Sequence, residues 1–79
     1  MENNLPEYPE INIEETGIQL KEKMDGFGYT VRDIQKYLGL SCPQSIYRWY
    51  QGKALPAVGH LYALSTLFQV HIEELLVKK

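Results

Sequence analysis

The sequence contains very little cysteine, with Cys42 as the only one among 79 residues. A single cysteine cannot form a disulfide within the chain, which is typical of proteins in a reducing, intracellular compartment. No apolar run is long enough to span a bilayer, and the acidic N-terminus lacks the basic and then apolar segments of a signal peptide. We therefore expect a cytoplasmic protein of one small domain, with no membrane partner.

Residue groups that would mark an enzyme or a metal centre are also missing. Cys42, His60 and His71 do not have the spacing of zinc ligands. No third orienting group accompanies Cys42 and His60, and no glycine-rich phosphate loop is present. We expect no catalytic residue, no metal and no cofactor, so the chain is not expected to be an enzyme. Because there is no room for a separate ligand domain, no small-molecule effector is expected either.

Acidic and basic side chains are distributed unevenly along the chain, although its net charge is only −2. Residues 1–27 carry seven acidic side chains and two basic ones, whereas residues 28–56 carry four basic side chains and one acidic one. Residues 57–79 are balanced. The basic charge is therefore local, as a small surface that faces phosphates would require.

The first twelve residues differ in composition from the rest of the chain. They contain two prolines, three acidic residues and few apolar side chains. We therefore expect a flexible acidic arm over 1–12, with Ile11 and Ile13 touching the body. A single helical domain is expected over 13–79.

The spacing of apolar residues predicts an all-α fold of five short helices. Apolar positions recur at steps of three and four, which places the helices at about 14–25, 31–38, 43–50, 58–68 and 72–77. The residues expected to face the core include Ile13, Gly17, Leu20, Met24, Phe27, Val31, Ile34, Tyr37, Leu38, Ile46, Trp49, Tyr50, Val58, Leu61, Leu64, Leu67 and Phe68.

Local signals mark where two of these helices begin and end. Thr30 with Asp33 three residues later has the spacing of a capping box, and Gly39 can end the second helix in a left-handed conformation. For the third helix, Ser41 or Cys42 is expected to be the N-cap, because Pro43 is tolerated in a first turn.

Three stretches of the sequence form a combination that is more specific than helix spacing alone. They are GYTVRDIQKYLGL at 28–40, PQSIYRWYQGKALP at 43–56 and LYALSTLFQVHIEELL at 61–76. Two short helices joined by a tight turn that contains glycine form a helix-turn-helix unit. With these stretches the chain resembles the phage-repressor and Cro-like helix-turn-helix family (the xenobiotic-response-element type), in particular small bacterial transcriptional regulators.

This resemblance implies a lambda-repressor-like domain that binds double-stranded DNA as a sequence-specific transcriptional regulator, with its recognition helix at about 43–50 in the major groove. The positions that face bases in the family match Gln44, Ser45, Tyr47 and Arg48, while Pro43 replaces a polar reader. The positions that contact phosphates match Thr30, Val31, Arg32, Gln51 and Lys53. Because one small domain makes few base contacts, a homodimer on two half-sites is expected.

Several of these residues have a second interpretation. Arg48 and Lys53 are also compatible with ordinary solvated surface charges. Gln44 can form a capping box with Ser41, and Tyr47 can pack on the fourth helix instead of on DNA. The acidic arm motivates a second hypothesis, a protein-interaction module, such as an antitoxin-like or anti-regulator protein, that binds a basic partner.

Overall fold

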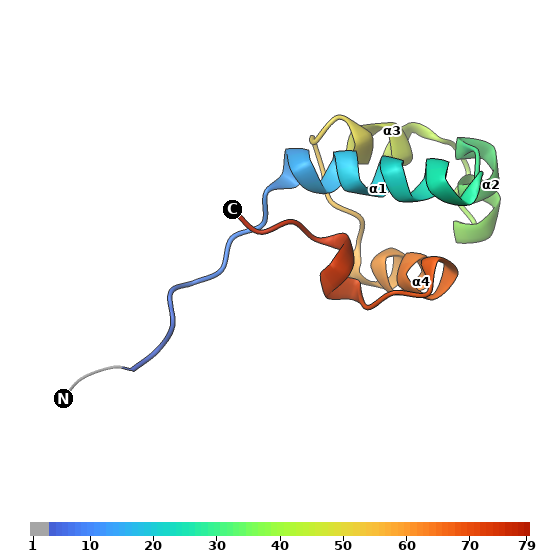
Figure 1. Ribbon diagram of the computed structural model, residues 1–79. Helices are drawn as coiled ribbons and strands as arrows, with labels where there is room; N and C mark the ends of the chain where they lie inside the picture. Colours follow the sequence, from blue (N-terminus) through green and yellow to red (C-terminus); the bar gives the residue numbers. More distant parts are fainter. Residues whose placement is uncertain (1–3) are drawn as a thin grey trace.

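The computed structural model describes residues 4–79, which form four α-helices and a final 3₁₀ helix (Figure 1). The elements are α1 (Ile13–Phe27), α2 (Val31–Leu38), α3 (Gln44–Tyr50), α4 (Val58–Phe68) and η1 (Ile72–Leu75). The predicted all-α fold class and the positions of the first four helices are confirmed. In the described part of the chain, no helix has both the length and the apolar character that crossing a membrane requires.

The fifth predicted helix, over 72–77, is wrong in type and in length. The backbone of Leu76 is already extended (φ −104°, ψ 134°), and its N–H donates to the Glu73 carbonyl (3.3 Å). The next N–H, that of Val77, donates to the buried Thr16 hydroxyl in α1 (2.9 Å). Because this N–H bonds to α1 and not to a carbonyl one turn earlier, the chain leaves the helical path after η1.

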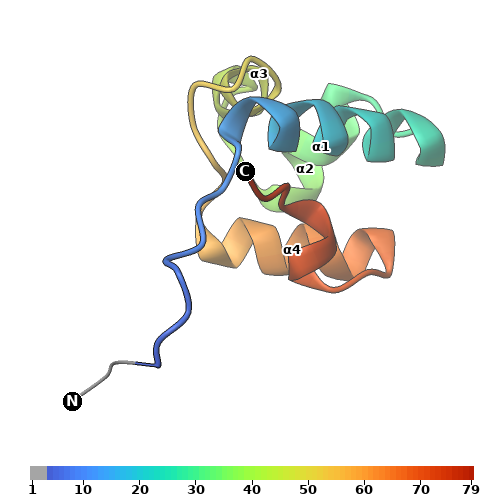
Figure 2. The same cartoon turned by 60° about the vertical axis from the view of Figure 1, so that its left-hand side comes forward.

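The two ends of the helical body are joined by backbone pairing. The Asn12 N–H donates to the Val77 carbonyl (2.7 Å), and Ile11 and Lys78 form an isolated antiparallel bridge. Residues 4–9 lead away from the helices (Figure 2). The last residues of the predicted arm are thus tied to the body, its first three lie outside the described residues, and the domain boundary after residue 12 stays a prediction.

Side chains from all five elements meet in one hydrophobic core. In both views α1 runs between α3 and α4 (Figures 1 and 2), and the core side chains fill the space that the helices enclose. Burial of Ile46 and Trp49 fixes which face of α3 points inward, as predicted. The buried members of the core are Leu20, Met24, Ile34, Ile46, Trp49, Leu61, Leu64, Phe68 and Leu75.

Four residues that were predicted to be buried are exposed: Ile13, Phe27, Tyr37 and Val58. Ile13 and Val58 are the first residues of their helices, at the edge of the core. Phe27, in the last turn of α1, lies parallel to the Tyr29 ring with 5.8 Å between centroids, so that only part of its surface is covered. The Tyr37 hydroxyl donates to the Ala63 carbonyl in α4 (2.9 Å), which keeps this ring at the surface.

The close contact between α1 and α3 depends on Gly17. A Cβ atom at this position would lie 2.1 Å from the carbonyl oxygen of Trp49 and 3.1 Å from that of Tyr50. Any side chain here would push α3 away from α1, because both oxygens belong to the backbone. Glycine at position 17 therefore sets the distance between the two helices.

Substituting this glycine is the direct test of the contact. We expect Gly17→Ala to lower the free energy of unfolding by about 1–3 kcal/mol, the usual cost of overpacking, because the methyl group would overlap the Trp49 carbonyl. Urea unfolding followed by the fluorescence of Trp49, the only tryptophan in the chain, measures the change.

Gly26→Ala is the matched control, because Gly26 lies in the same helix and a Cβ atom there would meet nothing within 4 Å. Alanine inside a helix is more stable than glycine by roughly 0.5–1 kcal/mol, so this variant should gain stability. A Gly17→Ala protein as stable as the wild type would contradict the described contact.

Candidate nucleic-acid interface

The N-terminus of α2 is held by the predicted capping box. The Asp33 N–H donates to the Thr30 hydroxyl (3.1 Å), and the Thr30 N–H donates to the Asp33 carboxylate (2.9 Å). These hydrogen bonds hold the pKa of Asp33 below its ordinary value, the largest contribution coming from the Thr30 backbone N–H. The box leaves the N–H groups of Val31 and Arg32 as the donors that this helix end can offer to an anion.

Gly39 ends α2 in the left-handed conformation that was predicted (φ 71°, ψ 30°). The Leu40 N–H donates to the Gln35 carbonyl (3.0 Å), and the Gln35 side-chain amide donates back to the Leu40 carbonyl (3.3 Å). The chain therefore turns within a few residues and starts α3 at a fixed angle to α2.

The start of α3 differs from the prediction by one residue. Pro43 itself is the N-cap, and its carbonyl accepts from the N–H groups of Ile46 (3.0 Å) and Tyr47 (3.2 Å). No side chain caps this helix, so Ser41 and Gln44 do not form the capping box that the sequence allowed. The reason is that proline fixes its own φ near the helical value and needs no N–H partner there. The Gln44 side chain is exposed and is not used as a cap.

The outward face of α3 carries the residues that were predicted to read bases. Gln44, Tyr47 and Arg48 are exposed, whereas Ser45 is half-buried. The Tyr47 ring packs edge-on against the Tyr50 ring, with 6.5 Å between centroids and 80° between planes. This packing restricts the Tyr47 ring while leaving about half of its surface open to a ligand.

The residues predicted to contact phosphates belong to two segments, one before α3 in the chain and one after it. Thr30, Val31 and Arg32 lie at the N-terminus of α2, while Gln51 and Lys53 follow α3 directly. All are exposed except Val31, which is half-buried against the core, so that only its backbone could face a phosphate. The arrangement brings one arginine and one lysine to the two ends of the helix-turn-helix unit.

A third basic side chain lies beside α3 and was not predicted from the sequence. The Lys21 ammonium in α1 is 5.9 Å from the centroid of the Tyr50 ring and 3.0 Å from the Asp25 carboxylate. Counting charges by segment concealed this lysine, because it belongs to the acidic first third of the chain. A helical projection of residues 13–27 would have placed it on the same side as Gly17 and Met24.

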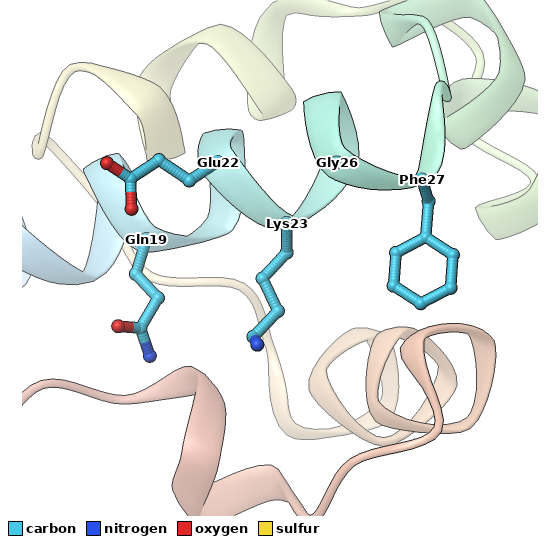
Figure 3. Close-up of a pocket in the computed structure, with 5 residues that line it drawn as sticks. All are labelled: Gln19, Glu22, Lys23, Gly26 and Phe27. Atoms are coloured by element: carbon cyan, nitrogen blue, oxygen red, sulfur yellow. The ribbon is translucent and has the colours of Figure 1, made fainter.

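The opposite side of α1 carries an open hollow lined by Gln19, Glu22, Lys23, Gly26 and Phe27. Gln19, Lys23 and Phe27 point away from α3 (Figure 3). The Gln19 side-chain amide donates to the Glu74 carbonyl, which joins α1 to η1. None of the residues predicted to contact DNA lines this hollow, so α1 presents two chemically separate sides.

The two residues considered as a nucleophile pair are in ordinary surroundings. Cys42 is exposed in the turn before α3. The His60 ring lies beside the Trp49 ring, with 6.1 Å between centroids. Within residues 4–79, no three histidine, cysteine or acidic side chains lie close enough together to hold a metal ion.

A family model described as helix-turn-helix matches residues 20–75. The chain belongs to this family. The match runs from the middle of α1 to the end of η1 and includes every residue that was predicted to contact DNA. The resemblance to the phage-repressor and Cro-like type is confirmed. A comparison with proteins of curated function finds no match.

Two solved structures have the same helix-turn-helix fold. The restriction-modification controller protein C.AhdI from Aeromonas hydrophila is 17% identical, with a TM-score of 0.69 over 80% of this chain and 94% of its own. The DNA-binding domain of BldD is 20% identical, with a TM-score of 0.66 over 82% of this chain and 93% of its own. At these identities the two neighbours establish the repressor-like fold alone.

The Thr30–Asp33 capping box generates a prediction about pH. The folded protein has a lowered Asp33 pKa, whereas the unfolded chain has the ordinary one of 3.8. The stability that Asp33 contributes is therefore complete above that ordinary value and is lost as the pH falls through the lowered, folded value. We expect Asp33→Asn to reduce the dependence of stability on pH in this acidic range.

Thermal unfolding from acidic to neutral pH measures this dependence. Glu22→Gln is the control, because it also removes one exposed carboxylate from a helix but does not touch a cap. If Asp33→Asn and the wild type lose stability equally as the pH falls, the capping box does not act as described.

Proposed function

We propose that this chain is a sequence-specific, DNA-binding transcriptional regulator that inserts α3 into the major groove. The observation that carries the proposal is the division of α3 into two faces. Ile46 and Trp49 anchor one face in the core, and the other presents Gln44, Tyr47 and Arg48 to solvent. A helix held in this way is a rigid rod of the width that the major groove admits.

The side chains on this face have the chemistry for reading base edges. The Gln44 amide matches the donor and acceptor pair of adenine, and the Arg48 guanidinium matches the two acceptors of guanine. The hydroxyl of Ser45 can address either kind of base, and the Tyr47 ring offers an apolar edge to a thymine methyl group. Each well-formed bidentate contact discriminates against the wrong base by roughly 1–3 kcal/mol.

Phosphate contacts would hold α3 in register. Arg32 and the N–H groups at the start of α2 precede α3 in the chain, and Gln51 and Lys53 follow it. Such contacts carry no sequence information, but they supply the salt-sensitive part of the affinity. The fold of this chain is that of C.AhdI, a restriction-modification controller protein, and of the BldD DNA-binding domain, which supports this assignment.

We propose that the chain binds as a homodimer. Few base contacts are available on one short helix, and the chain is acidic overall, so binding by a single copy should be weak. Two copies would place their α3 helices in half-sites about 34–36 Å apart, one turn of the duplex, or at a multiple of that spacing.

Two alanine variants distinguish contacts to bases, which give specificity, from contacts to phosphates, which give affinity. Arg48→Ala should reduce discrimination between the selected site and single-base variants by about 1–3 kcal/mol, because a base contact is lost. Lys53→Ala should weaken binding to all sequences alike. It should also reduce the steepness of the fall of log K with log salt by about 1. Fluorescence anisotropy with a duplex that the wild type has selected from a random pool measures both quantities.

Lys78→Ala is the charge-matched control, since Lys78 lies in the terminal pairing and not beside α3. A loss of specificity that is equal for Arg48→Ala and Lys53→Ala would contradict the assigned roles. Absence of salt-sensitive DNA binding by the wild type at low ionic strength would refute the function itself.

A protein-interaction module is the second candidate function, and the composition of the arm favours it. Leu5 and Tyr8 are exposed among the acidic residues of a segment that leads away from the helices (Figure 1). An acidic segment with exposed apolar side chains can fold onto a basic partner.

Deleting residues 1–9 tests this candidate without disturbing the pairing of residues 10–12 with the C-terminal segment. If the DNA-binding proposal is right, the truncated chain binds DNA at least as tightly as the full chain, because it has lost acidic charge. A stable protein partner that co-purifies with the full chain and is absent from the truncated one would favour the interaction module.

A further inference from the structure

A cluster of four side chains, Lys21, Asp25, Tyr47 and Tyr50, links α1 to the flank of α3, and of these only Tyr47 was assigned to the DNA interface from the sequence. The Lys21 ammonium lies 5.9 Å from the centroid of the Tyr50 ring. The Tyr50 ring in turn packs edge-on against the Tyr47 ring. Lys21 is also paired with Asp25, one helical turn along α1, at 3.0 Å. Lys21 and Asp25 are exposed, so both charges face the solvent next to α3.

The ring beneath Lys21 is fixed in place. The Tyr50 hydroxyl donates to the Met24 sulfur in α1, and Tyr50 is half-buried. Burial raises the pKa of Tyr50 to about 12, with further contributions from Asp25 and Tyr47, so its hydroxyl stays protonated and neutral at physiological pH. Because Gly17 also keeps α1 against α3, the position of Lys21 relative to Tyr47 is set by the fold and not by a mobile loop.

We propose that Lys21 is a further phosphate-binding residue of the DNA interface and that Asp25 competes with the phosphate for its ammonium group. This inference rests on the proposed function, because it assigns a part of the same interface. When Tyr47 enters the groove, Lys21, which lies beside the neighbouring Tyr50 ring, reaches the DNA backbone at the groove edge. Asp25 holds the ammonium in the free protein and lowers the affinity in the complex.

The physical balance favours an exchange of partners. An exposed ion pair between residues four apart on a helix is weak and is screened by salt. A phosphate brings a full negative charge and releases condensed counterions when a lysine neutralises it, so it is the stronger partner at low salt. Asp25 then lies close to the phosphate as an uncompensated negative charge, which opposes binding.

The other side of α1 supplies matched controls. Lys23 carries the same charge as Lys21 but points away from α3 (Figure 3), toward the hollow that Glu22 also lines. A general effect of net charge would act on Lys21 and Lys23 alike. A contact with a phosphate would act on Lys21 alone, apart from screened long-range terms.

The experiment measures binding to the selected duplex by anisotropy from low to moderate salt, using the full chain. Lys21→Gln should reduce the steepness of the fall of log K with log salt by about 1, so that a fourfold rise in salt costs about fourfold less affinity than in the wild type. Lys21→Arg should retain the wild-type slope, and so should Lys23→Gln. The Trp49 fluorescence of each variant reports that it is folded.

A double-mutant cycle tests the role of Asp25. Asp25→Asn should bind DNA more tightly than Glu22→Gln, although both remove one negative charge from α1. In the Lys21→Gln background the advantage of Asp25→Asn over Glu22→Gln should become smaller, because the ammonium group for which Asp25 competes is gone and only the repulsion between Asp25 and the phosphate remains.

The outcomes separate this inference from the function on which it rests. If Lys53→Ala lowers the slope while Lys21→Gln leaves it unchanged, or lowers it no more than Lys23→Gln, the Lys21 contact is refuted and the proposed function stands. If Asp25→Asn and Glu22→Gln act equally on the wild-type background, the competition is refuted. If the wild type shows no salt-sensitive DNA binding, both the inference and the function fail.

Discussion

The contact between α1 and α3 at Gly17 determines how the rest of the molecule is arranged. With no side chain at this position, the carbonyl oxygens of Trp49 and Tyr50 lie directly against α1. Trp49 and Ile46 then point into the core, and helical geometry turns the other side of α3 outward. The same contact brings Lys21 beside Tyr50. The exposed face of α3 and the charged flank next to it are therefore consequences of one close approach between two backbones.

The helix positions could be predicted because the signals that set them are local. Thr30 and Asp33 are three residues apart, and Gly39 ends α2 by its own conformation, so both boundaries are visible in a short stretch of sequence. The end of η1 depends instead on the hydrogen bond between Thr16 and Val77, which are far apart in the sequence and meet only in the folded chain. The periodicity of apolar residues predicted too long a helix here, because it carries no information about a hydrogen-bond acceptor as distant in the sequence as Thr16.

The candidate site also has some features that local sequence determines and others that depend on tertiary packing. The outward face of α3 follows from periodicity within one helix, and the resemblance to the Cro-like family then implied that Gln44, Tyr47 and Arg48 on this face read bases. The alternative capping role of Gln44 could be removed only by the structure, which shows Pro43 as an N-cap without a side-chain bond. Lys21 could not be found by counting charges along the chain, because its position beside α3 depends on tertiary packing.

The surface proposed to meet DNA consists of α3 and the start of α2. Backbone amide shifts, followed by NMR while the selected duplex is added to the labelled chain, test it most directly. We expect the largest changes at residues 44–51 and at Val31 and Arg32, with little change at η1 and the paired ends of the body. The largest changes at α4, η1 or residues 4–9, with α3 unaffected, would contradict it.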